Sequence, residues 1–191
     1  MGGVYSNIRN YSPWVDYFSS FPFSSAWVMV TTTNQQNYAQ VGWYKEDYLS
    51  SPAIYRVFAE WTTQLNNLDS AVQVLSTYSP TVGVWDYYTV LYNNTPGKFT
   101  FRHEGVDLIT PVTAAFIPTQ GQSLAETHSR KSQMAGGYNS SSHEQLSDVR
   151  IWYNNGWKVF NGTRGVTEPG IHEASIWSTT RVDTWDKACA N

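Results

Sequence analysis

The sequence runs Tyr38-Ala39-Gln40-Val41-Gly42-Trp43-Tyr44 at the point that decides the fold class. Side chains in this run alternate at every second position, which is the period of a β-strand. Gln40 therefore shares one face of the expected strand with Tyr38, Gly42 and Tyr44. The alternation predicts a strand with one face on the core and one face on a polar surface.

Other parts of the chain repeat this pattern and are rich in Val, Ile, Tyr, Trp, Phe and Thr, as strands are. These expected strands cover residues 26–31, 54–62, 84–92, 98–104, 112–117, 122–130, 147–153, 157–160 and 174–185. Hairpin turns are indicated at residues 93–97, 103–106 and 154–156, where Asn and Gly tolerate a positive φ. Residues 65–75 are the one candidate helix, with a loop or short turn as the alternative. We expect one all-β domain over residues 1–191, an antiparallel β-sandwich or jelly roll.

The composition narrows the class of function. Only 14% of the 191 residues are charged, the formal net charge is −3, and no basic patch is visible, so we expect no nucleic-acid partner. The chain has no apolar run of the length that spans a membrane. The N-terminus lacks the regions of a signal peptide, and Met1 is either a native start or one added to a mature secreted chain. We expect a secreted monomer.

Gln40 is the first candidate for chemistry. A Gln that pointed into an apolar core would leave polar atoms unpaired at a cost of about 1–3 kcal/mol. It therefore faces solvent or a polar cleft, and Gly42 leaves room on the same face for a ligand or a backbone. A solvent-exposed strand Gln is the alternative.

Two acidic residues are candidates to work with Gln40. Glu126 lies in an alternating run and shares its expected face with Leu124 and His128. A carboxyl and a carboxamide on facing strands can polarise a water and hold an oxyanion, so hydrolysis is the leading hypothesis. Glu60, on the strand that should pair with the Gln40 strand, is either a second carboxylate or a hydrogen-bond partner. A solvated surface carboxylate is the alternative for both.

Several other kinds of site are not indicated. No Gly-x-Ser-x-Gly elbow, no His-Glu-x-x-His motif and no phosphate-binding glycine loop occurs. We therefore expect neither a metal nor a cofactor. Five tryptophans could instead form a platform that stacks on sugar rings, although most should be core residues: Trp43, Trp61, Trp85, Trp152 and Trp157.

The motifs together resemble the glutamic peptidases, that is, the eqolisins and the neprosin family. Ala26-Trp27-Val28 is similar to the strand that precedes the first catalytic residue of eqolisins. The run from Ala39 to Trp43 is similar to the strand with the eqolisin catalytic Gln, where neprosins have Glu-Ala-Gly-Trp. Ala125-Glu126 falls where both groups have their catalytic Glu, and residues 132–137 look like the neprosin Gln-Met turn. The resemblance spans roughly residues 26–160 and mixes features of both groups.

The resemblance implies a concanavalin-like β-sandwich of glutamic-peptidase type, with Gln40 and Glu126 as the catalytic pair. It implies an endopeptidase that acts on peptide or protein substrates in acid, where a Glu titrates near its reference pKa of about 4.3. Tyr38, Tyr44, Glu60, Trp61 and His128 are the expected substrate-binding residues. The alternatives are a carbohydrate-binding or catalytically inactive module, and a jelly-roll glycoside hydrolase that uses Glu60 with Glu126.

Overall fold

The structure is a computed structural model of the 191-residue chain. It describes residues 1–16, 18, 22–48, 51–127, 132, 144–160, 162–163, 165, 172–178 and 181–186.

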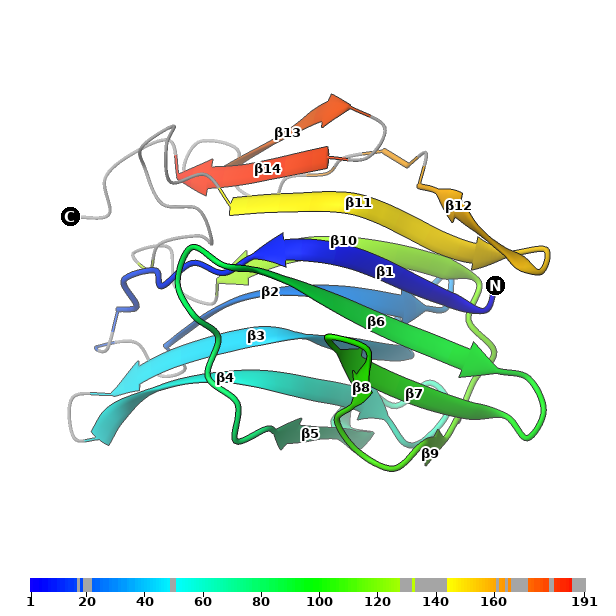
Figure 1. Cartoon of the computed structure of the whole chain (residues 1–191). Helices are drawn as coiled ribbons and strands as arrows, with labels where there is room; N and C mark the ends of the chain where they lie inside the picture. The colour runs from blue at the N-terminus through cyan, green and yellow to red at the C-terminus, as the bar shows by residue number, and fades with distance from the viewer. Residues whose placement is uncertain are drawn as a thin grey trace.

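Two antiparallel sheets pack face to face, which confirms the predicted β-sandwich (Figure 1). The five-stranded sheet has the order β10-β2-β3-β4-β5, and the nine-stranded sheet has the order β13-β14-β11-β1-β6-β7-β8, with β12 paired to β11 and β9 to β7. The strands of the first sheet are β2 (Phe23–Thr31), β3 (Tyr38–Tyr48), β4 (Ser51–Thr62), β5 (Ala71–Leu75) and β10 (Gln120–Thr127). Those of the second are β1 (Gly3–Arg9), β6 (Trp85–Asn93), β7 (Lys98–His103), β8 (Val106–Asp107), β9 (Val112–Thr113), β11 (Glu144–Tyr153), β12 (Gly156–Val159), β13 (His172–Ser178) and β14 (Arg181–Asp186).

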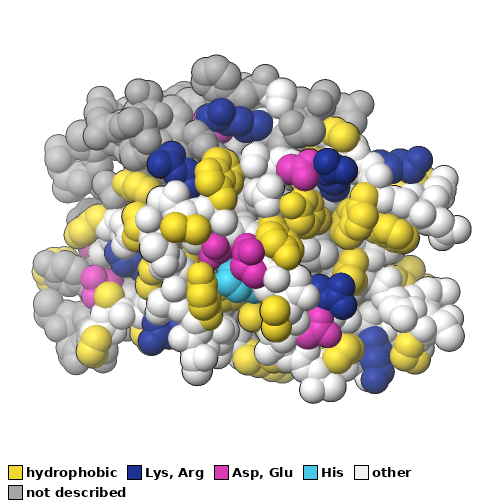
Figure 2. Space-filling model, viewed as in Figure 1, with side chains coloured by type: hydrophobic (Ala, Val, Ile, Leu, Met, Phe, Trp, Pro, Cys, Tyr) yellow, Lys and Arg dark blue, Asp and Glu magenta, His cyan; other side chains and the backbone are white. Residues whose placement is uncertain are grey.

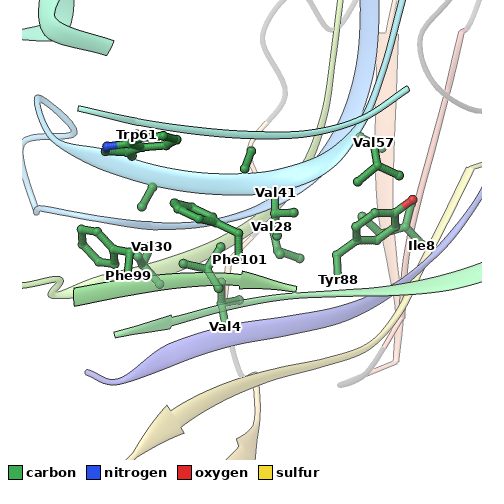
Figure 3. Close-up of a cluster of buried hydrophobic side chains, with 14 of the residues drawn as sticks. Val4, Ile8, Val28, Val30, Val41, Val57, Trp61, Tyr88, Phe99 and Phe101 are labelled. Atoms are coloured by element: carbon green, nitrogen blue, oxygen red, sulfur yellow. The ribbon is translucent and has the colours of Figure 1, made fainter. Parts of the chain in front are cut away.

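The core lies between the sheets and is built from alternate residues of each strand (Figure 3). Val28 and Val41 come from the five-stranded sheet, and Val4, Tyr88 and Phe101 come from the nine-stranded sheet. Full burial of each such side chain contributes about 1.5–3 kcal/mol. Because the core takes one face of each central strand, the intervening residues of these strands point to the outer faces of the sandwich.

The structure differs from the sequence prediction at four places. β1, which lies between β6 and β11, was not predicted, and the single expected strand at 174–185 is the hairpin of β13 and β14. The helical interpretation of residues 65–75 is wrong beyond one 3-10 turn, η1 (Leu68–Ser70), because β5 follows directly and pairs with β4. Of residues 112–117, only the first two form a strand.

The turn predictions at 103–106 and 154–156 are confirmed. Glu104 and Gly105 have φ of 53° and 77° in the reversal from β7 to β8, and Asn154 and Asn155 have φ of 49° and 58° between β11 and β12. Asn and Gly adopt such values at little cost. These two turns fix the hairpins that they close.

Gly42 marks the closest approach of β2 to β3. A Cβ atom at this position would lie 2.1 Å from the carbonyl oxygen of Ala26 and 2.6 Å from the Cα of Trp27. Both are backbone atoms of a paired strand, so they cannot move aside without breaking the β2–β3 ladder. The space that Gly42 leaves is therefore filled by protein backbone, one of the two occupants expected from the sequence.

We predict that Gly42→Ala destabilises the protein by about 1–3 kcal/mol or more, because overpacking forces the backbone to shift. The free energy of unfolding, measured in urea, checks this. Gly156→Ala is the matched control, since a Cβ there meets nothing within 4 Å, and its effect should stay within about 0.5 kcal/mol. Equal stability of the two variants would contradict the prediction.

Candidate functional site

The candidate site lies on the outer face of the five-stranded sheet. Trp27, Met29 and Phe58 form a buried apolar cluster on this face, separate from the main core, and Tyr38, Tyr44 and Leu124 pack around it. These apolar side chains surround the polar candidate residues of the same face.

The strand of Glu60 pairs with the strand of Gln40, as the sequence predicted, and the register makes the two residues direct partners in the β3–β4 ladder. Directly opposite residues of an antiparallel pair have their Cβ atoms about 4.5–5.5 Å apart. Gln40 is only 9% exposed. The Tyr38 hydroxyl donates a short hydrogen bond to Oε1 of Glu60, and Nε2 of Gln73 donates to Oε2 at 3.1 Å. Both oxygens of Glu60 therefore accept hydrogen bonds from side chains of the same face.

Glu126 lies on the same outer face, but in a different row. Gln40 pairs with Met29, Met29 pairs with Gln122, and Glu126 is four residues further along β10. Gln40 and Glu126 are thus two strands apart in one sheet, which corrects the expectation of facing strands. On a flat sheet this offset corresponds to about 16 Å between the two Cα atoms.

The electrostatics of Tyr38 link Glu126 to the Gln40–Glu60 pair. The pKa of Tyr38 is strongly raised by burial of its phenol, then by its hydrogen bond to Glu60, and further by the negative charges of Glu60 and Glu126. A charge acts on the phenol only if it lies within electrostatic range of it. Glu60 and Glu126 therefore both favour the protonated form of the Tyr38 hydroxyl, and the effect of Glu60 is the larger.

Trp27 occupies the row between Gln40 and Glu126, where it pairs with Gly42 on one side and Leu124 on the other. The side chain is buried, and among the described residues its indole Nε1 has no hydrogen-bond partner. An unpaired buried donor costs about 1–3 kcal/mol. A ligand carbonyl could satisfy it. Sequence reasoning did not select Trp27 as a functional residue, although its alternation with Ser25 and Met29 puts it on this face.

The remaining predicted residues have different outcomes. Tyr44 lies on the outer face and its hydroxyl donates to Oε2 of Glu46 at 2.5 Å. Trp61 does not belong to the site: it points into the main core, with its ring centroid 5.5 Å from that of Phe101 (Figure 3). It is one position from Glu60, and successive residues of a strand face opposite ways. His128 and the Gln133-Met134 turn lie outside the described residues.

One group in the described part of the chain could offer ligand atoms to a metal. Asp86, His103 and Glu104 each have one such atom within 4.8 Å of the others. Oδ2 of Asp86 already accepts from Nδ2 of Asn10 at 2.8 Å and lies 3.0 Å from Nε2 of His103. The buried Asp86–His103 pair therefore has a structural role without any ion.

Comparison with known families adds no assignment: no family model matches the chain, and no curated protein matches it. Among the described residues, no helix has the length and apolar character that a membrane crossing requires. The resemblance to glutamic peptidases thus continues to depend on the short motifs alone.

We predict that Asp86→Asn lowers the free energy of unfolding by about 1–3 kcal/mol at pH 7, because it removes a buried carboxylate that is hydrogen-bonded to Asn10 and His103. Burial alone would raise the pKa of Asp86, but hydrogen bonds from His103, Asn10 and Tyr78 outweigh it and hold the pKa below its ordinary value of 3.8. A carboxyl with a lowered pKa in the folded state contributes stability above its unfolded pKa and loses it as the pH falls through the folded pKa. The difference between wild type and variant should therefore shrink only below pH 3.8.

Urea unfolding at a series of pH values measures this difference. Asp107→Asn is the matched control, since its ion pair with Arg102 is 40% exposed on both sides and should be worth less than about 1 kcal/mol. If Asp86→Asn costs no more than Asp107→Asn, the buried pair does not have the stabilising role that we assign to it.

Proposed function

We propose that the chain is a secreted glutamic-type endopeptidase that hydrolyses peptide bonds at acid pH, with Gln40 and Glu126 as its catalytic residues. One observation supports this above the others. A nearly buried carboxamide, Gln40, and two carboxylates, Glu60 and Glu126, share the outer face of one sheet, and the charges of both carboxylates act on the same tyrosine.

The proposed reaction proceeds without a covalent intermediate. Glu126, ionised, takes a proton from a water molecule, and the water oxygen attacks the carbonyl carbon of the scissile peptide bond. The carbonyl oxygen becomes an oxyanion, to which the Nε2–H of Gln40 donates. Such a donor is worth about 3 kcal/mol or more in a shielded site. Glu126 then gives its proton to the leaving amine as the C–N bond breaks.

The reaction does not require Gln40 and Glu126 to lie in the same row of the sheet. The attacking water and the substrate carbonyl both lie between the two side chains, so the carboxylate and the carboxamide need not touch. Two hydrogen bonds and the reacting atoms between them span about 6 Å. Trp27, between the two, would offer its indole N–H to the same substrate.

The strand order supports Gln40 over Glu60 as the partner of Glu126. Counted from β10, Gln40 lies on the second strand and Glu60 on the third, in the same row. On a flat sheet Glu60 is therefore about 3 Å further from Glu126 than Gln40 is. A glycoside hydrolase would need Glu60 and Glu126 as its carboxylate pair at about 5–5.5 Å or 6.5–9.5 Å. Moreover, the bonds from Tyr38 and Gln73 engage both oxygens of Glu60. We assign Glu60 to positioning Tyr38.

We predict that the protein cleaves an unstructured protein substrate with an optimum in acid. Mass spectrometry of the products formed between about pH 2 and 7 measures this. Glu126→Gln should abolish cleavage, because the variant can neither take nor return the proton. Gln40→Ala should lower kcat by about 10²–10³-fold, the loss typical of one oxyanion donor. Gln36→Ala, an exposed carboxamide in the β2–β3 turn, is the control and should cleave like wild type.

Two results would contradict the proposal. The first is no cleavage at any pH by wild-type protein whose folding has been verified by circular dichroism. The second is acid cleavage that persists in Glu126→Gln, which would assign the base to another residue. If Glu60→Gln loses activity while Glu126→Gln remains active, Glu60 is the general base.

A further inference from the structure

A hollow of about 1170 Å³ lies on the outer face of the nine-stranded sheet, away from Gln40 and Glu126. Its floor follows from the register of that sheet. Thr89, Tyr5 and Arg150 form one row across β6, β1 and β11, and Leu91, Gly3 and Trp152 form the next. Gly3 contributes no side chain to the second row, and the side chain of Leu91 comes within 3.1 Å of the place where a Cβ atom of Gly3 would lie.

Aromatic rings form a continuous wall of this hollow. The ring centroids of Tyr5 and Tyr87 are 5.9 Å apart, those of Tyr5 and Trp157 are 6.0 Å apart, and those of Trp152 and Trp157 are 5.5 Å apart. These rings are not covered as core rings are: Trp157 is 37% exposed, and Tyr153 beside it is 50% exposed. An exposed group of packed aromatic rings on a hollowed face is typical of a binding surface.

The charges around the hollow neutralise one another. Nε of Arg102 lies 2.6 Å from Oδ1 of Asp107, and Nε of Arg150 lies 2.7 Å from Oδ1 of Asp148. Figure 2 shows basic and acidic side chains side by side among the hydrophobic ones on this face. A guanidinium has five N–H donors, and each of these ion pairs uses one through Nε. The hollow therefore combines flat rings with many hydrogen-bonding groups and little net charge.

We propose that this hollow, which we call the aromatic hollow, binds a neutral oligosaccharide chain. Pyranose rings have flat C–H faces that stack on tyrosine and tryptophan rings, and hydroxyl edges that both donate and accept hydrogen bonds. The arginines and Asp148, together with Asn93 and Asn154 of the rim, match those edges. The volume exceeds the range of about 300–1,000 Å³ that is usual for small-molecule pockets, which suits several linked sugars.

The same observations disfavour other occupants. A polyanion such as a nucleic acid needs a surplus of positive charge, and here each arginine has an acidic partner. A peptide that bound by β-strand addition would need an open sheet edge, whereas the aromatic hollow crosses the face of a sheet whose central strands are paired on both sides. A neutral, hydroxyl-rich ligand that stacks on rings fits these constraints best.

Glycan binding at the aromatic hollow is independent of the proposed peptidase site, because the two lie on opposite outer faces of the sandwich. If both hold, the hollow would attach the enzyme to a polysaccharide surface while the other face remains accessible to peptide. Gln40→Ala should bind sugar like wild type, so failure of one proposal leaves the other testable.

Isothermal titration calorimetry with cellohexaose, xylohexaose and chitohexaose tests the proposal on the full chain. We expect at least one of these neutral chains to bind wild type, and Trp157→Ala to weaken that binding by about tenfold or more, since it removes a stacking ring. Trp85→Ala is the matched control: Trp85 is 42% exposed on the same sheet but does not line the aromatic hollow, so binding should be unchanged.

Circular dichroism and thermal unfolding of each variant establish that it is folded, and Tyr153→Ala serves as the second test if Trp157→Ala does not fold. No binding of any of the three probes to wild type would overturn the proposal, as would equal binding by wild type and Trp157→Ala. Binding of a proline-rich peptide that depends on Trp157, in place of sugar, would instead assign the hollow to peptide recognition. Tighter, salt-sensitive binding of polygalacturonate would show that the ligand is an anion.

Discussion

Burial of one face of the central strands of both sheets is the constraint on which the rest of this structure depends. In β3, Ala39, Val41 and Trp43 are completely buried in the core, and a shift of one residue would turn all three outward. Gly42 adds to this constraint, since only a glycine lets β2 approach β3 so closely. Once these residues are in place, Gln40 can only point away from the core. The outward position of Gln40 is thus a consequence of the packing of the opposite face of β3 into the core.

The two outer faces that this packing leaves differ in chemistry. The five-stranded sheet has a carboxamide and carboxylates above an apolar floor, with Tyr38 hydrogen-bonded to Glu60. The nine-stranded sheet has aromatic rings flanked by arginines that are already paired with aspartates. The first arrangement concentrates groups that move protons and hold an oxyanion. In our proposal the second binds a ligand without reacting with it, and a sandwich of this size has room for both functions.

The sequence predicted the class of fold and the face on which Gln40 lies, because both follow from the period of a strand. It also predicted that the strand of Glu60 pairs with the strand of Gln40. It did not place Trp61 correctly, because both Glu60 and Trp61 were assigned to the site although successive residues of a strand face opposite ways, and Trp61 packs against Phe101 in the core. It could not give the spacing of Gln40 and Glu126, because that spacing depends on the strand order, which puts β2 between them. The sequence did offer Trp152 and Trp157 for a platform that stacks on sugar rings, but it could not place Tyr5 beside them, because Tyr5 and Trp157 are far apart in sequence and β1 was not predicted.

The buried Asp86–His103 pair bears on whether such a protein could work in acid. A stable fold at low pH requires that few carboxylates lose stabilising partners on protonation, and only 14% of this chain is charged. Asp86 is a buried carboxyl with buried hydrogen-bond partners, and its lowered pKa keeps it ionised below the pH at which an ordinary Asp would be protonated. The pair is therefore retained across the range in which an unperturbed glutamate changes its charge, near pH 4.3. Stability and the proposed chemistry would then have different pH limits, because the structural carboxyl loses its charge only at a lower pH than a typical catalytic one.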